Sequence, residues 1–362
     1  MEDLRAQLDA LRARIRRIES AQTAPAPGDL GGREVTTPAG RHLELERLST
    51  QHGGFSFHQF EELPPDALVA ISEGRIAALD PARLAFLDTE TTGLTNGAGT
   101  VAFLVGIGRL TARGFQVRQF FMRDFDEEPS LLYAVAEAFA DVDTLVTYNG
   151  RAYDEPLLAA RYRLTRQPPP FARLQHLDLL YGARRLWKLR FESCRLVELE
   201  GHILGLTREG DLPGRLIPQT YFEFLRTRRP GRLPAVFEHN ALDIQSLAAL
   251  TAILPGKFAG HSSPAHAAEM VGLARWLLRR GNREAALPLL EQAIMRIEFD
   301  RLPPARRRDV FLELAKHYER GERNWIKALE MAEEAAQLDG RAPQQRRIAR
   351  LRRKLGQIPL AD

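Results

Sequence analysis

The sequence contains a single cysteine, Cys194, among its 362 residues. One thiol cannot form a disulfide within the chain, which excludes a disulfide-stapled secreted scaffold and favours a reducing compartment. No apolar run approaches the ~18 residues that a membrane-spanning helix needs. The first five residues are mostly charged and provide no apolar signal core, so export is not expected. These absences predict a cytoplasmic protein that does not act in a membrane.

The sequence also has little net charge, because 51 basic residues nearly balance 47 acidic ones and leave a formal charge of +4. The balance is uneven along the chain. Residues 257–362 hold 21 basic and 14 acidic residues, whereas the residues before them hold 30 and 33. A basic C-terminal third suits a polyanion-binding surface. An arginine-rich helical face in water explains it as well, and charge alone favours that simpler interpretation.

Between residues 4 and 18, leucine or isoleucine recurs at spacings that alternate between four and three residues, which is typical of a coiled-coil seam. We therefore predict a short amphipathic helix over residues 1–20, which could pair two subunits or lie on its own chain. Residues 21–33 are rich in Ala, Pro and Gly and indicate a linker. Residues 34–82 combine a short alternating piece at residues 42–46 with a Gly-Gly turn at residues 53–54, and we interpret them as a small lead-in segment.

Apolar runs bounded by turn residues begin near residue 83 and predict successive strands, which are followed by alternating helices and strands. This order is typical of an α/β fold with a mixed sheet flanked by helices, and we assign it to residues 83–255. The predicted strands are 84–87, 101–107, 115–122 and 144–148, and the predicted helices are 130–139, 156–164 and 238–253.

Residues 264–356 show helical periodicity and no strand signal. Small residues recur there at offsets of about 40, a period that is typical of helical solenoid repeats. We therefore expect an all-α, tetratricopeptide-like tail, although periodicity alone would allow an ordinary helical bundle. The matching pairs are Ala274 with Ala315, Gly281 with Gly321, and Ala286 with Ala328.

Two carboxylates follow the first predicted strand of the sheet. Asp88 and Glu90 are two residues apart, so both side chains leave the same face of the strand. They come at the carboxyl end of the strand, where open α/β sheets place their ligands. Adjacent carboxylates repel each other when both are ionised, and oxygen ligands of this kind suit Mg²⁺ or Mn²⁺.

Three motifs in order resemble those of the DEDD 3′–5′ exonucleases, which belong to the ribonuclease-H-like superfamily. They are residues 86–94 (FLDTETTGL), residues 148–154 (YNGRAYD) and residues 239–243 (HNALD). The stretch 210–218 and a tetratricopeptide-like tail are similar to the YprB-like branch of that superfamily. The resemblance covers residues 84–250, and its first motif is the most specific.

The resemblance implies a two-metal site that uses Mg²⁺ or Mn²⁺. Asp88, Glu90 and Asp243 would hold one ion, and Asp88 with Asp154 would hold or orient the second. His239 would be the general base, one helical turn before Asp243. The known subclasses have either a histidine five residues before the last aspartate or a tyrosine four before it, so this histidine at the tyrosine spacing could also be a supporting or substrate contact. Candidate substrate contacts are Thr92, Leu94, Asn149 and Tyr153.

Other polar residues have simpler interpretations. No further ligand is spaced to join His176 and Asp178, so a structural role is favoured, and the same holds for His202 and Asp211. The basic and aromatic residues 184–190 suit single-strand binding, and a helix that buries Trp187 behind a charged rim explains them equally well.

Two functions remain after these arguments. The first is a metal-dependent nuclease that shortens single-stranded DNA or RNA from its 3′ end. The second is a catalytically weak or inactive nucleic-acid-binding or scaffold protein that uses its helical tail to recruit a protein partner. In either case the N-terminal helix could pair two subunits or lie on its own chain.

Overall fold

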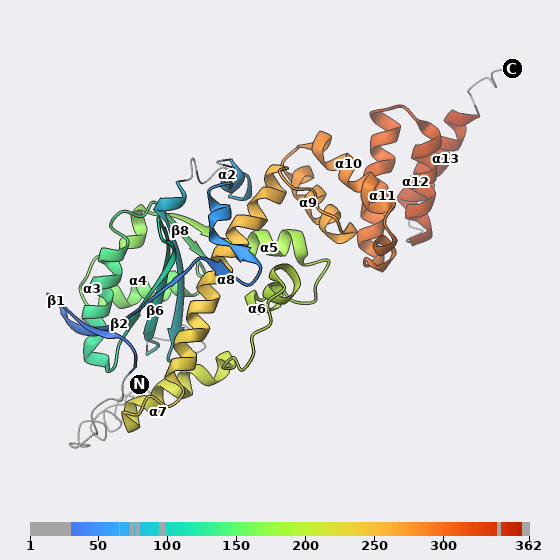
Figure 1. Cartoon of the computed structure of the whole chain (residues 1–362). Coiled ribbons are helices and arrows are strands. Elements are labelled where there is room, and N and C mark those ends of the chain that lie inside the picture. The colour runs from blue at the N-terminus through green and yellow to red at the C-terminus, as the bar shows by residue number, and fades with distance from the viewer. Residues whose placement is uncertain are drawn as a thin grey trace, which may run out of the picture. The chain divides into compact units, whose positions relative to one another are not determined.

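The computed structural model describes residues 30–64, 66–72, 76, 80–93, 99–338 and 342–356 (Figure 1). The predicted helix 1–20, most of the linker 21–33 and Leu94 lie outside these residues. The chain forms two compact units. The sheet unit comprises the described residues up to Leu180 together with Arg195–Ala259, and the helical unit comprises Tyr181–Cys194 and the described residues from Gly260 onward.

The sheet unit is built on a seven-stranded mixed sheet in the order β1-β2-β7-β6-β5-β8-β9. β5 pairs antiparallel with β6 and parallel with β8, so the α/β fold with a mixed sheet is confirmed. A separate two-stranded sheet joins β3 (Gln51–His52) to β4 (Phe55–Ser56). The seven strands are β1 (Arg33–Thr37), β2 (Gly40–Ser49), β5 (Leu84–Thr91), β6 (Ala102–Thr111), β7 (Gly114–Phe121), β8 (Thr144–Thr147) and β9 (Gln175–Asp178).

The predicted strands and helices from residue 84 onward are present with small shifts of their ends. The helix expected to begin at Ser130 begins at Glu128. Ser130 therefore lies inside the helix, and its buried hydroxyl bonds to Thr37 Oγ1 and His42 Nδ1, both at 2.9 Å. The helices that begin before residue 260 are α2 (Ala67–Ile71), α3 (Glu128–Ala138), α4 (Asp154–Leu164), α5 (Leu179–Trp187), α6 (Leu196–Leu199), α7 (Ile217–Thr227) and α8 (Leu233–Ala259).

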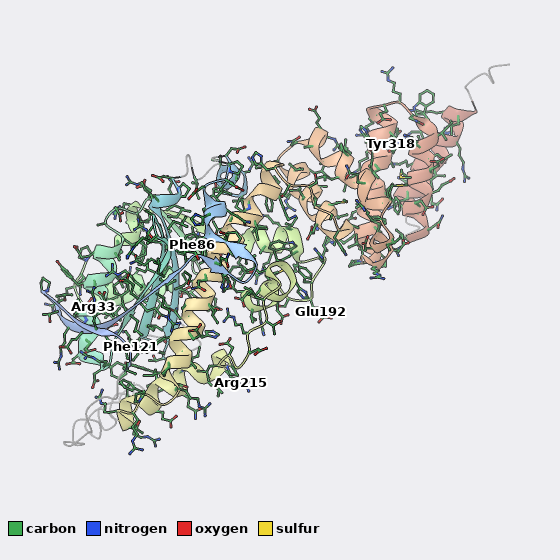
Figure 2. The ribbon with its side chains drawn as sticks, in the orientation of Figure 1. Arg33, Phe86, Phe121, Glu192, Arg215 and Tyr318 are labelled. Carbon is green, nitrogen blue, oxygen red and sulfur yellow. The ribbon has the colours of Figure 1, made fainter. Side chains whose placement is uncertain are left out.

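The core of the sheet unit is strongly aromatic, and Phe86 and Phe121 lie inside it (Figure 2). The long helix α8, drawn in yellow in Figure 1, packs against β5, β6 and β7. This close approach depends on Gly106 in β6. A Cβ atom at this residue would lie 2.2 Å from Asn240 Oδ1 and 2.3 Å from Ile244 Cδ1. Because Gly106 has no side chain, α8 can pack closely enough to bring Asn240 into contact with the sheet.

We expect Gly106→Ala to lower the free energy of unfolding by about 1–3 kcal/mol, the usual cost of overpacking a core. The added methyl group would push Asn240 and Ile244 away from β6. Urea unfolding monitored by circular dichroism measures the change, because all three tryptophans lie in the helical unit and would not report on β6. Gly54→Ala is the matched control, because a Cβ atom there meets no atom within 4 Å. Equal unfolding midpoints for the two variants would contradict this packing.

The described part of the helical unit contains five successive helices, each of which packs against the next. An alanine seam of Ala286, Ala315, Ala328 and Ala332 is fully buried between them. This unit therefore confirms the expected helical C-terminal region, while its assignment to a repeat family stays a prediction. The helices are α9 (Ala267–Arg279), α10 (Arg283–Ile294), α11 (Pro304–Arg320), α12 (Trp325–Leu338) and α13 (Ala342–Leu355).

Trp187 also belongs to this unit. Its ring is fully buried, and its Nε1 donates to Glu269 Oε1 at 2.9 Å, while Arg190 Nη1 lies 2.7 Å from the same oxygen. Of the two interpretations of residues 184–190, the structure shows the buried tryptophan with a charged rim. Across the described ranges, no helix combines the length and apolarity that crossing a membrane requires.

Candidate active site

Asp88 and Glu90 lie in the C-terminal half of β5, an interior strand of the sheet, directly after the buried apolar run 84–87. Asp88 pairs with Gly106 across the sheet and Glu90 pairs with Leu104. The register with β6 shifts between Glu90 and Thr91, so the ladder becomes irregular directly after the two carboxylates. β5 therefore holds both carboxylates on a rigid central element at the edge of the apolar core.

Asn240 on α8 holds the Asp88 carboxylate. Its Nδ2 donates to Asp88 Oδ2 at 2.8 Å, and its Oδ1 accepts from Gln119 Nε2 at 2.9 Å. The Asn240 side chain is fully buried, so this orientation is set on both ends by protein atoms. Asn240 belongs to the third motif, but the sequence assigned no role to it.

Asp154 begins α4 and reaches the same region. Thr89 Oγ1 donates to Asp154 Oδ1. The turn before Asp154 is shaped by Asp178, whose carboxylate accepts from the backbone N–H groups of Asn149 at 2.8 Å and Arg151 at 3.2 Å. Asn149 has a φ of 68°, a left-handed conformation that asparagine tolerates. Asp178 thus supports the turn that leads into Asp154.

His176 has the structural surroundings expected for it. Its Nε2 lies 2.8 Å from Thr147 Oγ1, and its Nδ1 lies 2.6 Å from Glu155 Oε2. Both ring nitrogens therefore have protein partners.

Arg208 is a charged residue of the site that sequence reasoning missed. Its guanidinium grips Glu200, with Nε 2.7 Å from Glu200 Oε2 and Nη2 bonded to Glu200 Oε1. Nη2 also donates to Asp243 Oδ1, and Nη1 lies 3.2 Å from Asp211 Oδ2. The side chains of Arg208 and Glu200 are only 7% and 1% exposed. The site therefore contains its own buried cation, bonded to one of the four predicted carboxylates.

His239 lies between Asp211 and Asp243. Its Nδ1 is 2.8 Å from Asp211 Oδ1, and its Nε2 is 3.7 Å from Asp243 Oδ2. Arg208 Nη1, a donor, also lies 3.4 Å from Nδ1, but the Asp211 carboxylate is closer and only accepts hydrogen bonds. Nδ1 therefore carries the hydrogen, and Nε2 is left with its lone pair when the ring is neutral. Asp211, for which the sequence favoured a structural role, is the residue that orients this ring. Its place in the stretch 210–218, which carried part of the resemblance, was the available signal.

The four predicted carboxylates come close enough to act on one another. Burial raises the pKa of Asp88 well above its ordinary value, and the charges of Asp243 and Asp154 raise it further. Burial likewise raises the pKa of Glu90, with Asp88 as the strongest charged neighbour. Burial also raises the pKa of Asp243, and Arg208 opposes this rise. The structure therefore gathers the four residues at one half-buried site that carries an excess of negative charge.

The predicted substrate contacts are less uniform. Tyr153, directly before Asp154, has a side chain that is 50% exposed. Thr92 is half-buried, and its Oγ1 accepts from the backbone N–H of Val101 at 3.0 Å. Of these two, Tyr153 is the better placed to meet a bound molecule.

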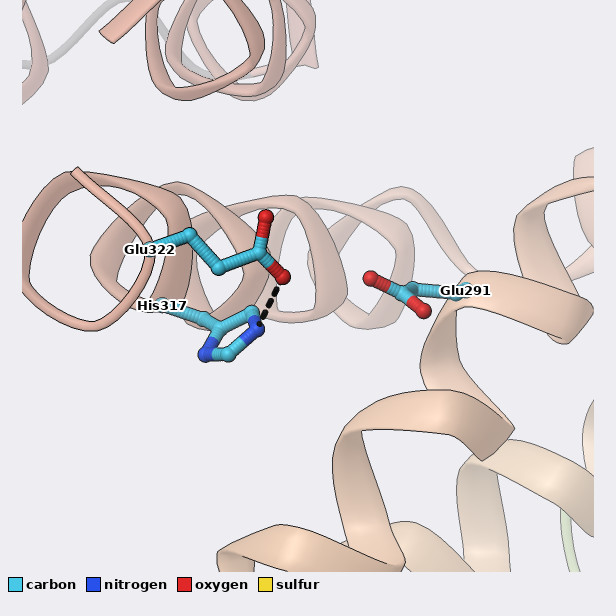
Figure 3. A group of neighbouring side chains, drawn as sticks. All are labelled: Glu291, His317 and Glu322. Atoms are coloured by element: carbon cyan, nitrogen blue, oxygen red, sulfur yellow. Dashed lines mark hydrogen bonds and ion pairs between the residues drawn. The ribbon is translucent and has the colours of Figure 1, made fainter. Parts of the chain in front are cut away.

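A different set of side chains has the tightest grouping of possible metal ligands in the described ranges. Atoms of Glu291, His317 and Glu322 lie within 4.8 Å of one another in the helical unit (Figure 3). His317 Nε2 bonds to Glu322 Oε1 at 3.0 Å, and Glu291 Oε1 accepts from the hydroxyl of Tyr318 at 2.6 Å. These bonds account for the grouping without an ion. No three of the four predicted carboxylates are grouped as tightly among the described residues.

We expect the metal-free protein to lose stability as the pH rises through about 6. Burial raises the pKa of Asp154 from its ordinary 3.8 to about 6. A carboxyl group with a higher pKa in the folded than in the unfolded chain holds its proton more tightly when folded, so its contribution is complete below pH 3.8 and is lost as the pH passes 6. The loss is no more than about 3 kcal/mol, because solvent screens a half-buried group.

Urea midpoints measured in EDTA at pH values on both sides of 6 check this expectation. Asp154→Asn removes the titrating group, so the pH dependence of the variant should be flatter than that of the wild type. Parallel profiles for the two proteins would contradict the assignment.

Comparison with known proteins agrees with this architecture. A model of the RNase H superfamily matches residues 85–254, the part of the chain that carries all four carboxylates. The chain is 32% identical over 352 residues to the uncharacterised protein YprB of Bacillus subtilis (strain 168), covering 85% of this chain and 84% of YprB.

A solved structure of the family B DNA polymerase from the hyperthermophilic archaeon Pyrobaculum calidifontis matches 67% of this chain, with 11% sequence identity and a TM-score of 0.34. The match spans only 34% of the polymerase chain, and a score of this size supports no functional parallel. The identity to YprB over most of both chains is decisive: the protein belongs to the YprB family, and its sheet unit contains an RNase H superfamily domain.

Proposed function

We propose that the sheet unit is a metal-dependent 3′–5′ exonuclease that hydrolyses phosphodiester bonds of single-stranded nucleic acid. The observation that carries the proposal is the gathering of Asp88, Glu90, Asp154 and Asp243 within a domain of nuclease type. Buried carboxylates that repel one another are costly unless a cation is present, and such groups of titrating residues with shifted pKa values mark functional sites.

The residues suit hard divalent cations, because all four candidate ligands are carboxylates. Asp88, Glu90 and Asp243 would hold one Mg²⁺ or Mn²⁺, and Asp88 with Asp154 would hold a second. Bound there, the ions would supply charge stabilisation for the attacking and leaving oxygens of an in-line displacement. Asn240 fixes the carboxylate that both ions would share, and Thr89 fixes Asp154.

His239 supports the same chemistry as a proton acceptor. Asp211 holds Nδ1 and turns Nε2 toward the carboxylate site. A neutral imidazole in this orientation can take the proton of an attacking water at Nε2. Asp211 is thus a positioning residue, and its replacement would act through the orientation of the histidine ring.

The ion pair between Arg208 and Asp243 favours a second candidate function. A protein cation that already neutralises one candidate ligand leaves less charge for metal ions. The chain would then bind nucleic acid without turnover and use its helical unit for a protein partner.

The deciding experiment incubates the full chain and Mn²⁺ with single-stranded DNA and RNA that carry a 5′ label. We expect a ladder of shortened products that keep the label, no products in EDTA, and resistance of a circular strand, which has no 3′ end. Intact substrates throughout, with measurable binding, would favour the second candidate. Cleavage of the circular strand would overturn the 3′–5′ assignment while retaining a nuclease.

A further inference from the structure

A cavity of about 500 Å³ lies among α9, α10 and α11 of the helical unit. We call it the arginine groove. Its lining combines two kinds of side chain. Aliphatic residues provide an apolar floor, namely Leu278, Leu290, Val310 and Leu312, and charged residues surround it, namely Arg275, Arg279, Arg283, Lys316, Asp309 and Glu313.

The two acidic residues of the groove are already shared between cations. Asp309 lies 3.4 Å from Arg306 Nη1 and 2.8 Å from Arg308 Nη2. Glu313 lies 3.4 Å from Arg283 Nη1 and 2.5 Å from Lys316 Nζ. The positive charge of the groove therefore exceeds what its own carboxylates can neutralise.

Arg275 and Arg279 are the cations left over. They lie four residues apart on α9, so they share one face of the helix. Within the described ranges, the guanidinium group of neither residue forms a hydrogen bond or an ion pair. Burial lowers the pKa of Arg275, the nearby charges of Arg306 and Arg279 lower it further, and Asp309 offsets this lowering only in part. A half-buried guanidinium surrounded by like charges is stabilised when an anion binds to it.

The aliphatic floor of the groove indicates which of two polyanions fits it better, a single-stranded nucleic acid or an acidic peptide. Proteins that bind single strands stack the bases on aromatic side chains, and no aromatic residue is among those that line the groove. An aliphatic floor instead accepts an aliphatic side chain, and the planar guanidinium fork matches a carboxylate in two parallel hydrogen bonds.

We propose that the arginine groove binds an acidic peptide segment of a protein partner. Carboxylates of the peptide would bind Arg275 and Arg279, and a neighbouring leucine-like side chain would occupy the floor. The proposal goes beyond the nuclease function, because it concerns the other unit and requires no metal.

The test uses a fluorescein-labelled peptide that repeats Glu-Glu-Leu and measures fluorescence anisotropy with the full chain in EDTA. Arg279→Glu reverses the charge of an exposed side chain and should weaken binding about tenfold or more, since hydrogen bonds to charged groups are among the stronger ones. Arg296→Glu changes an equally exposed arginine of the same unit outside the groove lining, and should leave affinity within about twofold. A peptide with Gln for Glu, or with Ser for Leu, should bind more weakly than the parent.

Equal affinities for the two variants would overturn the proposal, as would indifference to the Leu-to-Ser change. A labelled oligothymidylate that displaces the peptide and loses affinity in Arg279→Glu would also overturn it, because the groove would then hold phosphates. Asp88→Asn should bind the peptide like the wild type, so failure of the nuclease proposal and failure of this one are separate results.

Discussion

Replacing Asp88 by asparagine is expected to abolish phosphodiester hydrolysis and, at neutral pH without metal, to stabilise the protein. The substitution keeps the size of the side chain and leaves an oxygen that can still accept from Asn240. It removes the carboxylate that both proposed ions would share, so hydrolysis should fall at least about a thousandfold, the equivalent of several kcal/mol of lost charge stabilisation.

The gain in stability follows from the same charge. Because burial and the charges of Asp243 and Asp154 raise the pKa of Asp88, its ionised form is unfavourable in the folded protein at neutral pH. Asparagine removes that cost. Urea midpoints in EDTA should therefore be higher for the variant, and the difference should shrink as the pH falls and wild-type Asp88 takes up its proton.

Asp126→Asn is the matched control, since Asp126 is an exposed carboxylate of the same unit. It should alter neither hydrolysis nor the midpoint. Undiminished hydrolysis by Asp88→Asn would place the reaction at another site. Lost hydrolysis without any gain in stability would show that Asp88 is uncharged or well compensated in the folded chain.

Arg208→Ala is expected to lower the free energy of unfolding by about 3–5 kcal/mol, the cost of removing one partner from a buried ion pair. The loss leaves Glu200, whose side chain is 1% exposed, without its counter-ion. It also removes the cation that Asp211 and Asp243 share. Chemical unfolding in EDTA measures the change directly.

Two further variants separate charge from geometry. Arg208→Lys keeps the charge and loses the two-pronged grip on Glu200, so its midpoint should lie between those of the wild type and the alanine variant. Replacing Arg208 and Glu200 together by leucine removes the uncompensated charge and should recover part of the loss. An alanine variant as stable as the wild type would show that this ion pair contributes nothing to folding.

The four candidate carboxylates were the most predictable part of this site. Asp88 and Glu90 follow an apolar strand directly, so local pattern alone places both on one face at the end of β5. Asp154 and Asp243 could be predicted only from the order of the three motifs, because the fold alone brings these residues close to β5.

The supporting residues were not predictable in this way. Arg208 and Asp211 lie in an irregular segment that follows α6, where no periodicity indicates which way a side chain points. Their partners His239 and Asp243 lie on α8, and the third partner, Glu200, directly follows α6. A contact of this kind exists only after packing, so spacing along the chain does not encode it.

The strand β2 escaped prediction for another reason. Four successive residues, His42 to Leu45, are buried, because both faces of the strand are covered there. His42 and Glu44 remain polar and satisfy each other through a hydrogen bond of 3.2 Å. Apolar and polar residues alternate in this strand, but this alternation does not indicate which side chains are buried. For this reason the sequence did not predict β1 and β2, two strands of the main sheet.

The guanidinium of Arg208 has a consequence for how the folded state is reached. In small zinc domains the ion supplies the free energy of folding, and a chelator unfolds them. Here an amino-acid side chain already offsets the charge of Asp243 and Glu200 before any ion arrives. We therefore expect the domain to fold without a bound metal ion. If an ion binds Asp243 as we propose, it would compete with Arg208 for that carboxylate, so its net affinity would be the difference between two interactions.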